Sequence, residues 1–505
     1  MTPVTARAHS GRAIEVVLAL LIFMTAGWFH HREPGWNVNS RLALTMALVE
    51  DGSVRVDRWI APGAPLETND VAEFGGHVYS DKIIGTSLLG VPAAAAMRAL
   101  ERGAGAGPFS METRRYVITL FSVGLCAALA VVVLMRLFLL WGGGQMGPAG
   151  AALAAALTWL GSMLMPYSTL FMSYAPAVLG LLAGLWFYES RGGDNPTAGR
   201  WFAIGAALGG AVLCEYTAAI AAGLLFLYMV AAPPARAWKA WPAVAAGLLV
   251  LAPFFAYTFH IFGRLAIPYE FERMDLFREQ MSQGFMGLGR PRLSVAALVT
   301  VLPYRGVLIH SPYLIVTLGA AIATLVAARG RQWGRAGVSL AIFAAYVIFN
   351  SAYYMWWGGW SFSARHLAPA VCFAALPAAF FWGSKLLRWS FISLGLVGAA
   401  LHLVVVAVDP QPRDLNPFTT LDILLQPSFS ETYTSLFFRH IWPSFLLGDT
   451  APNAGQWLAG LNGPWGVVPL LAMWLLGAGA ICIFDRHSRL SLIDLTTPPK
   501  ESSLP

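Results

Sequence analysis

The sequence predicts an all-α polytopic membrane protein with about 12 transmembrane helices. Hydrophobic residues make up 57% of its 505 residues and charged residues only 12%, whereas a soluble protein carries about 25% charge. Apolar runs long enough to cross a bilayer recur along the whole chain. Arginine and lysine gather in alternate short loops between those runs, which is typical of polytopic inner-membrane proteins.

The first apolar run, Ile14 to Phe29, is expected to be a retained anchor helix. Arg7 and Arg12 precede it, and the residues at 28–32 lack the small side chains of a signal-peptide cleavage site. We expect transmembrane helix 1 over residues 14–30.

A long polar region, residues 31–114, follows this helix and forms the predicted first periplasmic loop. It contains one short apolar stretch, Ile83 to Met97, which is interrupted by Pro92. That stretch is marginal for a full span, so we expect a helix at the membrane interface.

Eleven further spans are predicted from the remaining apolar runs. Within 201–230 the run is too long for one helix and is interrupted by Glu215-Tyr216, so a hairpin of two helices is expected there. The other spans are predicted at 115–135, 148–166, 174–188, 241–260, 311–328, 337–353, 367–383, 390–408 and 465–484. Residues 261–306 and 409–464 are predicted polar loops.

The basic residues of the short loops fall on one side of the membrane in this arrangement, and that side is the cytoplasm by the positive-inside rule. Both termini are then cytoplasmic. The residues are Arg7, Arg12, Arg136, Arg191, Arg200, Arg236, Lys239, Arg329, Arg331, Arg335, Lys385, Arg388, Arg486 and Arg489. The net charge of +7 is therefore a signal of topology. No basic, aromatic-interleaved patch of a nucleic-acid-binding protein is present, so no nucleic-acid partner is expected.

The unusual polar and aromatic residues all fall on the opposite, outer side. They are Tyr79-Ser80-Asp81-Lys82, Tyr167, Tyr174, Glu215, Tyr216, Tyr269, Glu270, Glu272, Tyr304, Arg305, Trp356, Trp357, Trp360, Arg365 and His366. Carboxylates can take a proton from an acceptor hydroxyl, lysine and arginine can hold a phosphate, and aromatic rings can stack on a sugar. Their convergence predicts a site on the outer face.

Each cluster also has a structural alternative. The tryptophans fit an interfacial aromatic belt, and Glu215 fits a hairpin cap. Arg305 and Arg365 fit pairing with lipid headgroups or loop acids, and His366 fits a hydrogen-bonded structural histidine. The sequence has no metal-ligand spacing, phosphate loop or nucleophile elbow, so no cofactor is predicted and a divalent metal is left open.

Three short motifs carry a family resemblance. The first loop contains Asn39-Ser40-Arg41-Leu42-Ala43-Leu44 and later Ser80-Asp81-Lys82-Ile83-Ile84-Gly85, and the hairpin Gly209-Gly210-Ala211-Val212-Leu213-Cys214-Glu215-Tyr216 comes further on. Together with the helix–long loop order, these motifs resemble the GT-C superfamily of integral-membrane glycosyltransferases over roughly residues 10–390. That superfamily includes the protein mannosyltransferases and the lipid A aminoarabinose transferases.

The resemblance implies a GT-C-like bundle that transfers a sugar, with inversion, from a polyprenyl-phosphate donor to a periplasmic acceptor. A first-loop carboxylate would be the base and Lys82 would bind the donor phosphate. Here 37–41 lacks the acidic pair that often opens this loop, so the ordered candidates for the base are Asp70, Asp81 and Asp57. The substrate-binding candidates are Lys82, Tyr79, Arg41, Glu215, Tyr216, Arg305, Trp356, Trp357, Arg365 and His366.

We expect an inner-membrane protein with a catalytic module at 1–390. Residues 391–505 would add C-terminal helices, the periplasmic segment 409–464 and a short cytoplasmic tail. The acceptor is left open between a lipid-linked glycan, an envelope polysaccharide and a protein. The rival functions are a flippase or transporter of lipid-linked sugar, a non-catalytic envelope-assembly protein, and a glycan polymerase or ligase. The absence of a visible repeat between the halves disfavours a transporter.

Overall fold

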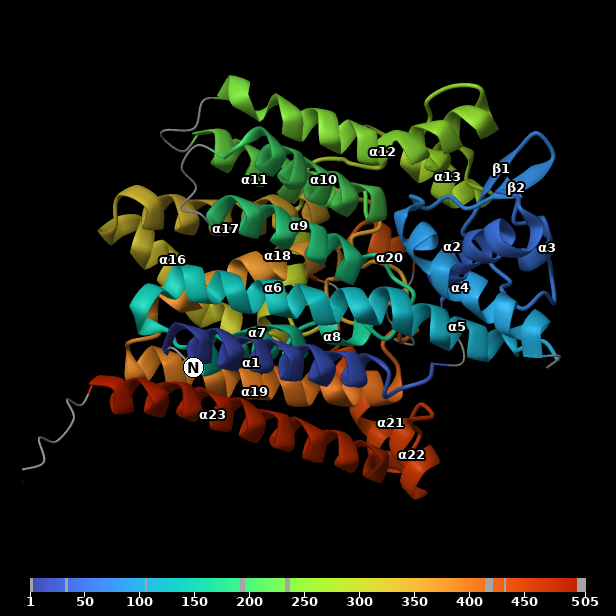
Figure 1. Cartoon of the computed structure of the whole chain (residues 1–505). Coiled ribbons are helices and arrows are strands. Elements are labelled where there is room, and N and C mark those ends of the chain that lie inside the picture. Colours follow the sequence, from blue (N-terminus) through green and yellow to red (C-terminus); the bar gives the residue numbers. More distant parts are fainter. Residues whose placement is uncertain are drawn as a thin grey trace, which may run out of the picture.

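A computed structural model describes residues 3–31, 35–104, 107–190, 196–231, 237–413, 421–430 and 433–496. Arg191, Arg236 and parts of the predicted segment 409–464 lie outside the described residues. Long helices run roughly side by side in a bundle, and a smaller group of short helices and a β-hairpin covers one end (Figure 1).

The bundle follows the predicted spans closely. Its helices are α1 (Pro3–Ala26), α5 (Met111–Thr119), α6 (Leu125–Gly142), α7 (Pro148–Leu160), α8 (Leu164–Tyr167), α9 (Tyr174–Glu189), α10 (Ala198–Cys214), α11 (Ala218–Ala231), α12 (Trp241–Phe262), α16 (Tyr313–Ala327), α17 (Gly330–Ala352), α18 (Ala368–Ala375), α19 (Lys385–Val408) and α23 (Val468–Thr496). Among the described residues, 5 helices are long and apolar enough to cross a membrane. The chain is therefore membrane-integral, and the count of about twelve spans stays a prediction.

The run from Trp201 to Val230 is broken where the sequence predicts. Helix α10 ends at Cys214, and Glu215 takes an extended backbone conformation before α11 begins at Ala218. At this break, backbone N–H and C=O groups that would be hydrogen-bonded within a continuous helix lose their partners. Glu215 lies between the two helices and belongs to neither.

The first loop folds against the end of the bundle. It contains α2 (Trp36–Met46), α3 (Asp57–Ile60), β1 (Ala72–Phe74), β2 (His77–Tyr79) and α4 (Gly85–Ala104). The Ser87 hydroxyl donates to the Arg41 carbonyl at 2.8 Å, which ties α4 to α2. Glu50 accepts from Arg114 at 2.7 Å, so this loop acid joins the end of α2 to α5.

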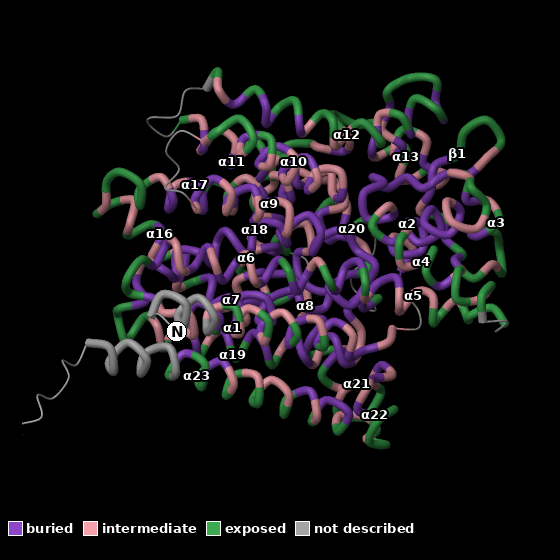
Figure 2. The backbone as a smooth tube through the Cα atoms, in the orientation of Figure 1, coloured by how far each residue is buried: buried purple, intermediate pink, exposed green. Residues whose placement is uncertain are grey.

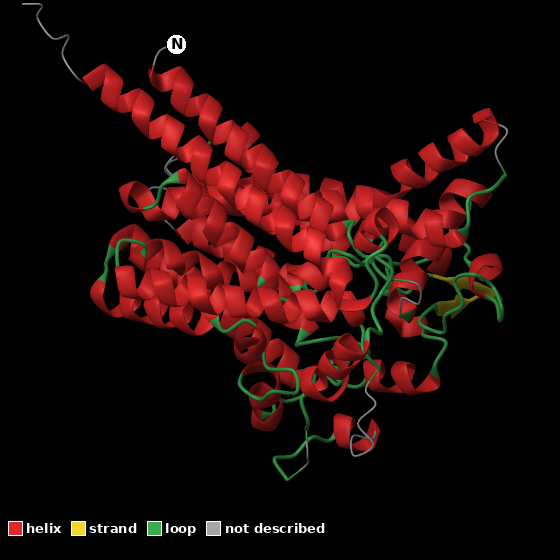
Figure 3. Cartoon of the chain, turned by 90° about the horizontal axis from the view of Figure 1, so that it is seen from below, coloured by secondary structure: helices red, strands yellow, loops and turns green. Residues whose placement is uncertain are grey.

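The β-hairpin is an addition to the expected all-helical architecture. Phe74 pairs with His77 across a two-residue turn of Gly75 and Gly76, both of which have positive φ. A two-residue turn with two positive φ angles suits glycine and matches the twist of the strands. Figure 3 shows the two strands at the end of the molecule away from the N-terminus.

Among the described residues, three shorter α-helices lie between α12 and α16, and three lie between α19 and α23. They are α13 (Asp275–Ser282), α14 (Leu293–Thr300), α15 (Val307–His310), α20 (Leu421–Leu425), α21 (Trp442–Leu447) and α22 (Ala454–Ala459), with the single turn Pro268–Phe271 preceding α13. The last of these segments is pinned to the end of α1, because the backbone N–H of His30 donates to the Pro452 carbonyl at 2.8 Å.

Buried residues fill the middle of the bundle and the interior of the first loop (Figure 2). The outer helices expose large apolar side chains, such as Leu249 on α12 and Leu475 on α23. In a membrane-integral chain these side chains face lipid.

Candidate active site

Asp70, Asp81, Lys82 and Glu272 form an acid–lysine cluster at the end of the bundle. The Lys82 ammonium lies 2.8 Å from an Asp70 carboxylate oxygen and also contacts Asp81. Asp81, Lys82 and Glu272 are each no more than 3% exposed. One lysine therefore faces several carboxylates in a nearly water-free setting, where charge interactions are strong.

The chain brings these residues together from two distant segments. The segment Ser80–Ile84 joins β2 to α4 and carries Asp81 and Lys82, and Ser40 of α2 donates to Asp81 at 2.9 Å. Glu272 follows the turn Pro268–Phe271 and bridges in antiparallel fashion to Ala72. The hairpin edge therefore sets the position of Glu272 beside the first-loop acids.

Burial and the repulsion between the carboxylates decide which carboxyl group of the cluster is protonated. Burial, followed by the charges of Asp81 and Asp70, raises the pKa of Glu272 to about 11. Burial and the Asp70 charge also raise the pKa of Asp81, to about 6. Burial opposes the charge of Lys82, but the attraction of the carboxylates outweighs it and holds the pKa of Lys82 above its ordinary value. At neutral pH Glu272 is therefore protonated, whereas Asp81 is ionised and Lys82 is charged.

The same three carboxylates are a group that a metal ion would suit. Their oxygen atoms lie within 4.8 Å of one another. Carboxylate oxygens are preferred ligands of divalent magnesium, calcium and manganese. The Lys82 ammonium pairs with two of these carboxylates, Asp70 and Asp81. A metal ion would therefore have to bind the carboxylates beside that ammonium or displace it from them.

Arg41 and Glu215 form a second polar group beside the acid–lysine cluster. Their charged atoms lie 3.7 Å apart, and Ser173 connects them by donating to Glu215 and accepting from Arg41. Arg41 is 3% exposed, and its Nε has no hydrogen-bond partner among the described residues. Glu215 thus caps the helix break and also balances a buried arginine.

A close backbone contact joins these two groups. A Cβ on Gly85 would lie 2.3 Å from the Leu213 carbonyl oxygen, so the start of α4 touches the end of α10 directly. The first-loop motif that ends at Gly85 and the hairpin motif that ends at Tyr216 are therefore in contact. Tyr216 packs on Tyr269, and the Lys82 ammonium lies 5.0 Å from the centre of the Tyr269 ring.

The other predicted arginines lie inside the protein. Arg365 experiences the charges of both Asp70 and Glu215, and its side chain passes against Gly358, where a Cβ would lie 2.8 Å from it. Arg305 is fully buried and donates to the Ser361 hydroxyl at 3.2 Å. Both have a buried Nε that lacks a partner among the described residues.

The remaining predicted site residues have structural contacts. Trp356 and Trp357 are buried, at 0% and 7% exposure, and do not form an interfacial belt. His366 packs edge-on against Tyr353. Asp57 lies apart from the cluster, where it accepts from the Val78 backbone at 3.1 Å.

Tyr79 is buried beside the cluster, and its backbone forms an antiparallel β-bridge with the backbone of Arg55. Glu272 and Tyr269 lie beside Lys82 in the structure. The sequence analysis placed both residues on the outer face but did not include them among the candidate site residues. The only sequence signal was their position just after a span.

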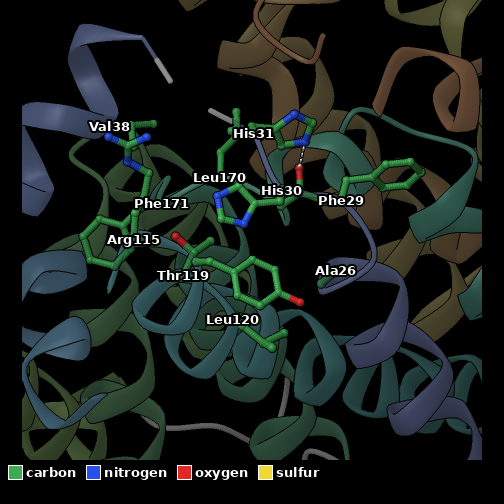
Figure 4. A pocket seen from close by; sticks show the side chains of 12 residues that line it. Ala26, Phe29, His30, His31, Val38, Arg115, Thr119, Leu120, Leu170 and Phe171 are labelled. Carbon is green, nitrogen blue, oxygen red and sulfur yellow. Dashed lines mark hydrogen bonds between the residues drawn. The ribbon is translucent and has the colours of Figure 1, made fainter. Parts of the chain in front are cut away.

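A hollow between α1 and α5 is too small for a substrate. It has a volume of about 20 Å³, which holds about one water. His30 and His31 are among the side chains that line it (Figure 4). The His31 ring shares a hydrogen bond of 3.0 Å with the Thr169 hydroxyl. Burial, followed by the charge of His30, lowers the pKa of His31 to about 3, so this ring is neutral at physiological pH.

The fold has solved counterparts. ArnT from Cupriavidus metallidurans bound to undecaprenyl phosphate matches with a TM-score of 0.50 and 15% identity, over 94% of this chain and 77% of that one. Its apo form matches with a TM-score of 0.50 and 16% identity, over 95% and 78%. The oligosaccharyltransferase AglB from Archaeoglobus fulgidus, in complex with an inhibitory peptide and a dolichol-phosphate, matches with a TM-score of 0.48 and 13% identity, over 95% and 72%.

The sequence matches no family model and no curated protein. The chain shares the fold of ArnT, and the resemblance predicted from the sequence is confirmed at the level of the fold. The likeness to ArnT extends over nearly the whole chain, so the first loop, the bundle and the C-terminal helices are all part of it.

Proposed function

We propose that this chain is a membrane glycosyltransferase that moves a sugar from a polyprenyl-phosphate donor to an acceptor on the outer face of the inner membrane. The observation that carries the proposal is the acid–lysine cluster, in which the Lys82 ammonium lies 2.8 Å from Asp70 at the end of a GT-C fold. A cation and a base side by side are what sugar transfer from a phosphate ester needs.

Asp70 is the best candidate for the base. Its side chain is 16% exposed, whereas that of Asp81 is 0% exposed and Glu272 is protonated at neutral pH. A general base must lie within hydrogen-bond reach of the acceptor hydroxyl, and Asp70 is the more accessible of the two aspartates. Asp81 then keeps Lys82 charged and in place.

The reaction is a direct displacement at the anomeric carbon, with inversion. The acceptor oxygen forms the new bond to that carbon, Asp70 takes the hydroxyl proton, and the bond to the phosphate oxygen breaks. The departing phosphate takes the electron pair, and Lys82 stabilises its charge. Arg41 and Arg365 each have a buried Nε without a hydrogen-bond partner among the described residues, and they are further forked donors for the phosphate.

The test is transfer of radiolabelled sugar from a panel of polyprenyl-phosphate donors into membranes that carry wild type or variants. We expect Asp70→Asn and Lys82→Ala to lower turnover by about 100-fold or more. Asp275→Asn is the control, because that side chain is 78% exposed and its ion-pair partner is Arg278 and not Lys82. Repeating the assay with a chelator shows whether a metal takes part.

Two results would contradict the proposal. Undiminished transfer by Asp70→Asn would place the base elsewhere. Full rescue of a deletion strain by both Asp70→Asn and Lys82→Ala would favour a non-catalytic assembly protein.

A further inference from the structure

A cavity separate from the acid–lysine cluster lies between the β-hairpin and α12. Its volume is about 500 Å³, within the range of small-molecule sites, in contrast to the water-sized hollow between α1 and α5. Its wall consists of residues 52–55 of the first loop, Phe74, Gly75, His77 and Tyr79 of the hairpin, and His260 and Ile261 of α12. Figure 1 shows the hairpin beside this end of α12.

The lining of this cavity suits an anion. It presents Arg55, His77 and His260 and contains no carboxylate. Within the described part of the chain, no carboxylate pairs with the Arg55 guanidinium. Two acids lie nearby, and both have partners: Asp57 pairs with His77 at 3.7 Å and Glu73 pairs with Arg273. The permanent charge of Arg55 is thus available to a ligand.

The cavity also lies where a span leaves the bilayer. His260 is two residues before the end of α12, whose outer face is apolar. Phe259 and Leu265 on either side of it are 62% and 64% exposed. A cationic cavity beside lipid-facing side chains fits an amphiphile whose headgroup is anionic and whose chains remain in the bilayer.

One wall is shared with the acid–lysine cluster. Tyr79 lines the cavity, and Ser80, Asp81 and Lys82 follow it directly. The Tyr257 hydroxyl, one turn before the cavity residues of α12, donates to the Ser80 carbonyl at 3.0 Å and holds this wall. A headgroup in the cavity would therefore lie next to the proposed catalytic residues.

We propose that this cavity binds the phosphate-bearing headgroup of an amphiphile, with Arg55 as its principal charged contact and His77 and His260 as further donors. The assignment of that amphiphile as the acceptor rests on the proposed function. The proposal that the cavity binds a phosphate-bearing headgroup is independent of the proposed function, because it follows from the residues that line the cavity.

Binding of phosphatidic acid to the full chain in phosphatidylcholine nanodiscs tests the proposal without any turnover. We expect Arg55→Gln to lower the retained phosphatidic acid, measured by native mass spectrometry, by about tenfold, because a charge-assisted contact is lost. Arg58→Gln is the matched control: Arg58 lies in the same loop, pairs with Asp51 and is outside the cavity. The thermal unfolding midpoint of both variants checks their folding.

Equal retention by Arg55→Gln and Arg58→Gln would overturn the proposal. If inorganic phosphate displaces the lipid from wild type, the cavity recognises the phosphate alone. If inorganic phosphate does not displace the lipid and binding still depends on Arg55, the acyl chains also contribute to binding. Displacement and its absence both support the site as long as binding depends on Arg55. Asp70→Asn should bind the lipid as wild type does while it fails to transfer sugar. Binding that depends on Arg55 in a chain that transfers nothing would leave the anion site standing and remove its acceptor role.

Discussion

Lys82 is one cation among three carboxylates, and this imbalance decides the chemistry of the site. A single ammonium cannot neutralise Asp70, Asp81 and Glu272 together in a buried setting, so one carboxyl keeps its proton. Glu272 is that carboxyl, because it is buried and is repelled by both Asp81 and Asp70. Asp70 is the more exposed carboxylate, and it is the one that a substrate can reach.

Glu272 should make the stability of the protein depend on pH. Its pKa is raised from 4.5 to about 11 on folding, so between these values the unfolded state binds fewer protons than the folded state. The free energy of unfolding therefore falls as pH rises, by up to about 1.4 kcal/mol per pH unit for one proton. Glu272→Gln should reduce this fall between about pH 7 and pH 9, where Asp81 is already ionised in both states.

Unfolding in mixed micelles at the two pH values measures this effect. Glu270→Gln is the control, because that side chain is 47% exposed and only two residues away. Parallel pH dependence of wild type and Glu272→Gln would show that Glu272 is ionised in the folded protein.

At the scale of the elements, the site depends on how closely α4 approaches the break between α10 and α11. Gly85 begins α4 against the backbone of Leu213 and Cys214. No other residue type fits without displacing one of the two segments. This contact holds Asp81 and Lys82, just before α4, next to Glu215, just after α10.

Gly85→Ala should therefore destabilise the protein and reduce transfer. Its Cβ would lie 2.3 Å from the Leu213 carbonyl oxygen, and overpacking of this kind costs about 1–3 kcal/mol. Gly103→Ala in the same helix has nothing within 4 Å of its Cβ, so it should stabilise α4 by about 0.5–1 kcal/mol. Thermal midpoints and transfer rates of the two variants would separate the effects. A Gly85→Ala variant as stable and active as Gly103→Ala would refute the close-contact argument.

For the whole molecule, the hairpin and the start of α4, which carry first-loop residues of the site and the cavity, lie at one end of the bundle. The N-terminal start of α1 and the last turns of α23 lie at the other end (Figure 1). The short basic loops predict that the end with the termini is cytoplasmic. The outer surface between the two ends is apolar along α12 and α23. The site would then face the periplasm, where a lipid-linked donor can reach it from the bilayer.

Cysteine labelling of intact cells checks this orientation. With the native cysteines replaced by alanine, Ser282→Cys at the site end should react with a membrane-impermeant maleimide. Gly144→Cys, after α6 at the other end, should react only once the inner membrane is permeabilised. The reverse pattern would place the site in the cytoplasm. The cysteines to replace are Cys126, Cys214, Cys372 and Cys482.

Local composition was enough to predict the positions of most long apolar helices, because a bilayer imposes length and apolarity on each helix separately. The break at Glu215 was predictable for the same reason, since a carboxylate in an apolar run needs a partner. The β-hairpin was missed although Gly75-Gly76 is a hairpin signal, because only three residues pair on each side and the surrounding loop is polar. The choice of twelve spans and the site assignments remain predictions.

The sequence by itself determined the membrane class and the placement of most helices, and it singled out the first-loop residues Asp70, Asp81 and Lys82, which lie together in the structure. Only the tertiary structure brought Glu272 to that place, set Asp57 apart from it, and buried Trp356 in the interior. The physical reason is that helix formation in a bilayer is a local property of composition. The pairing of Glu272 with residues about 190 positions away depends on how the hairpin edge and α12 pack, and no local pattern records that packing.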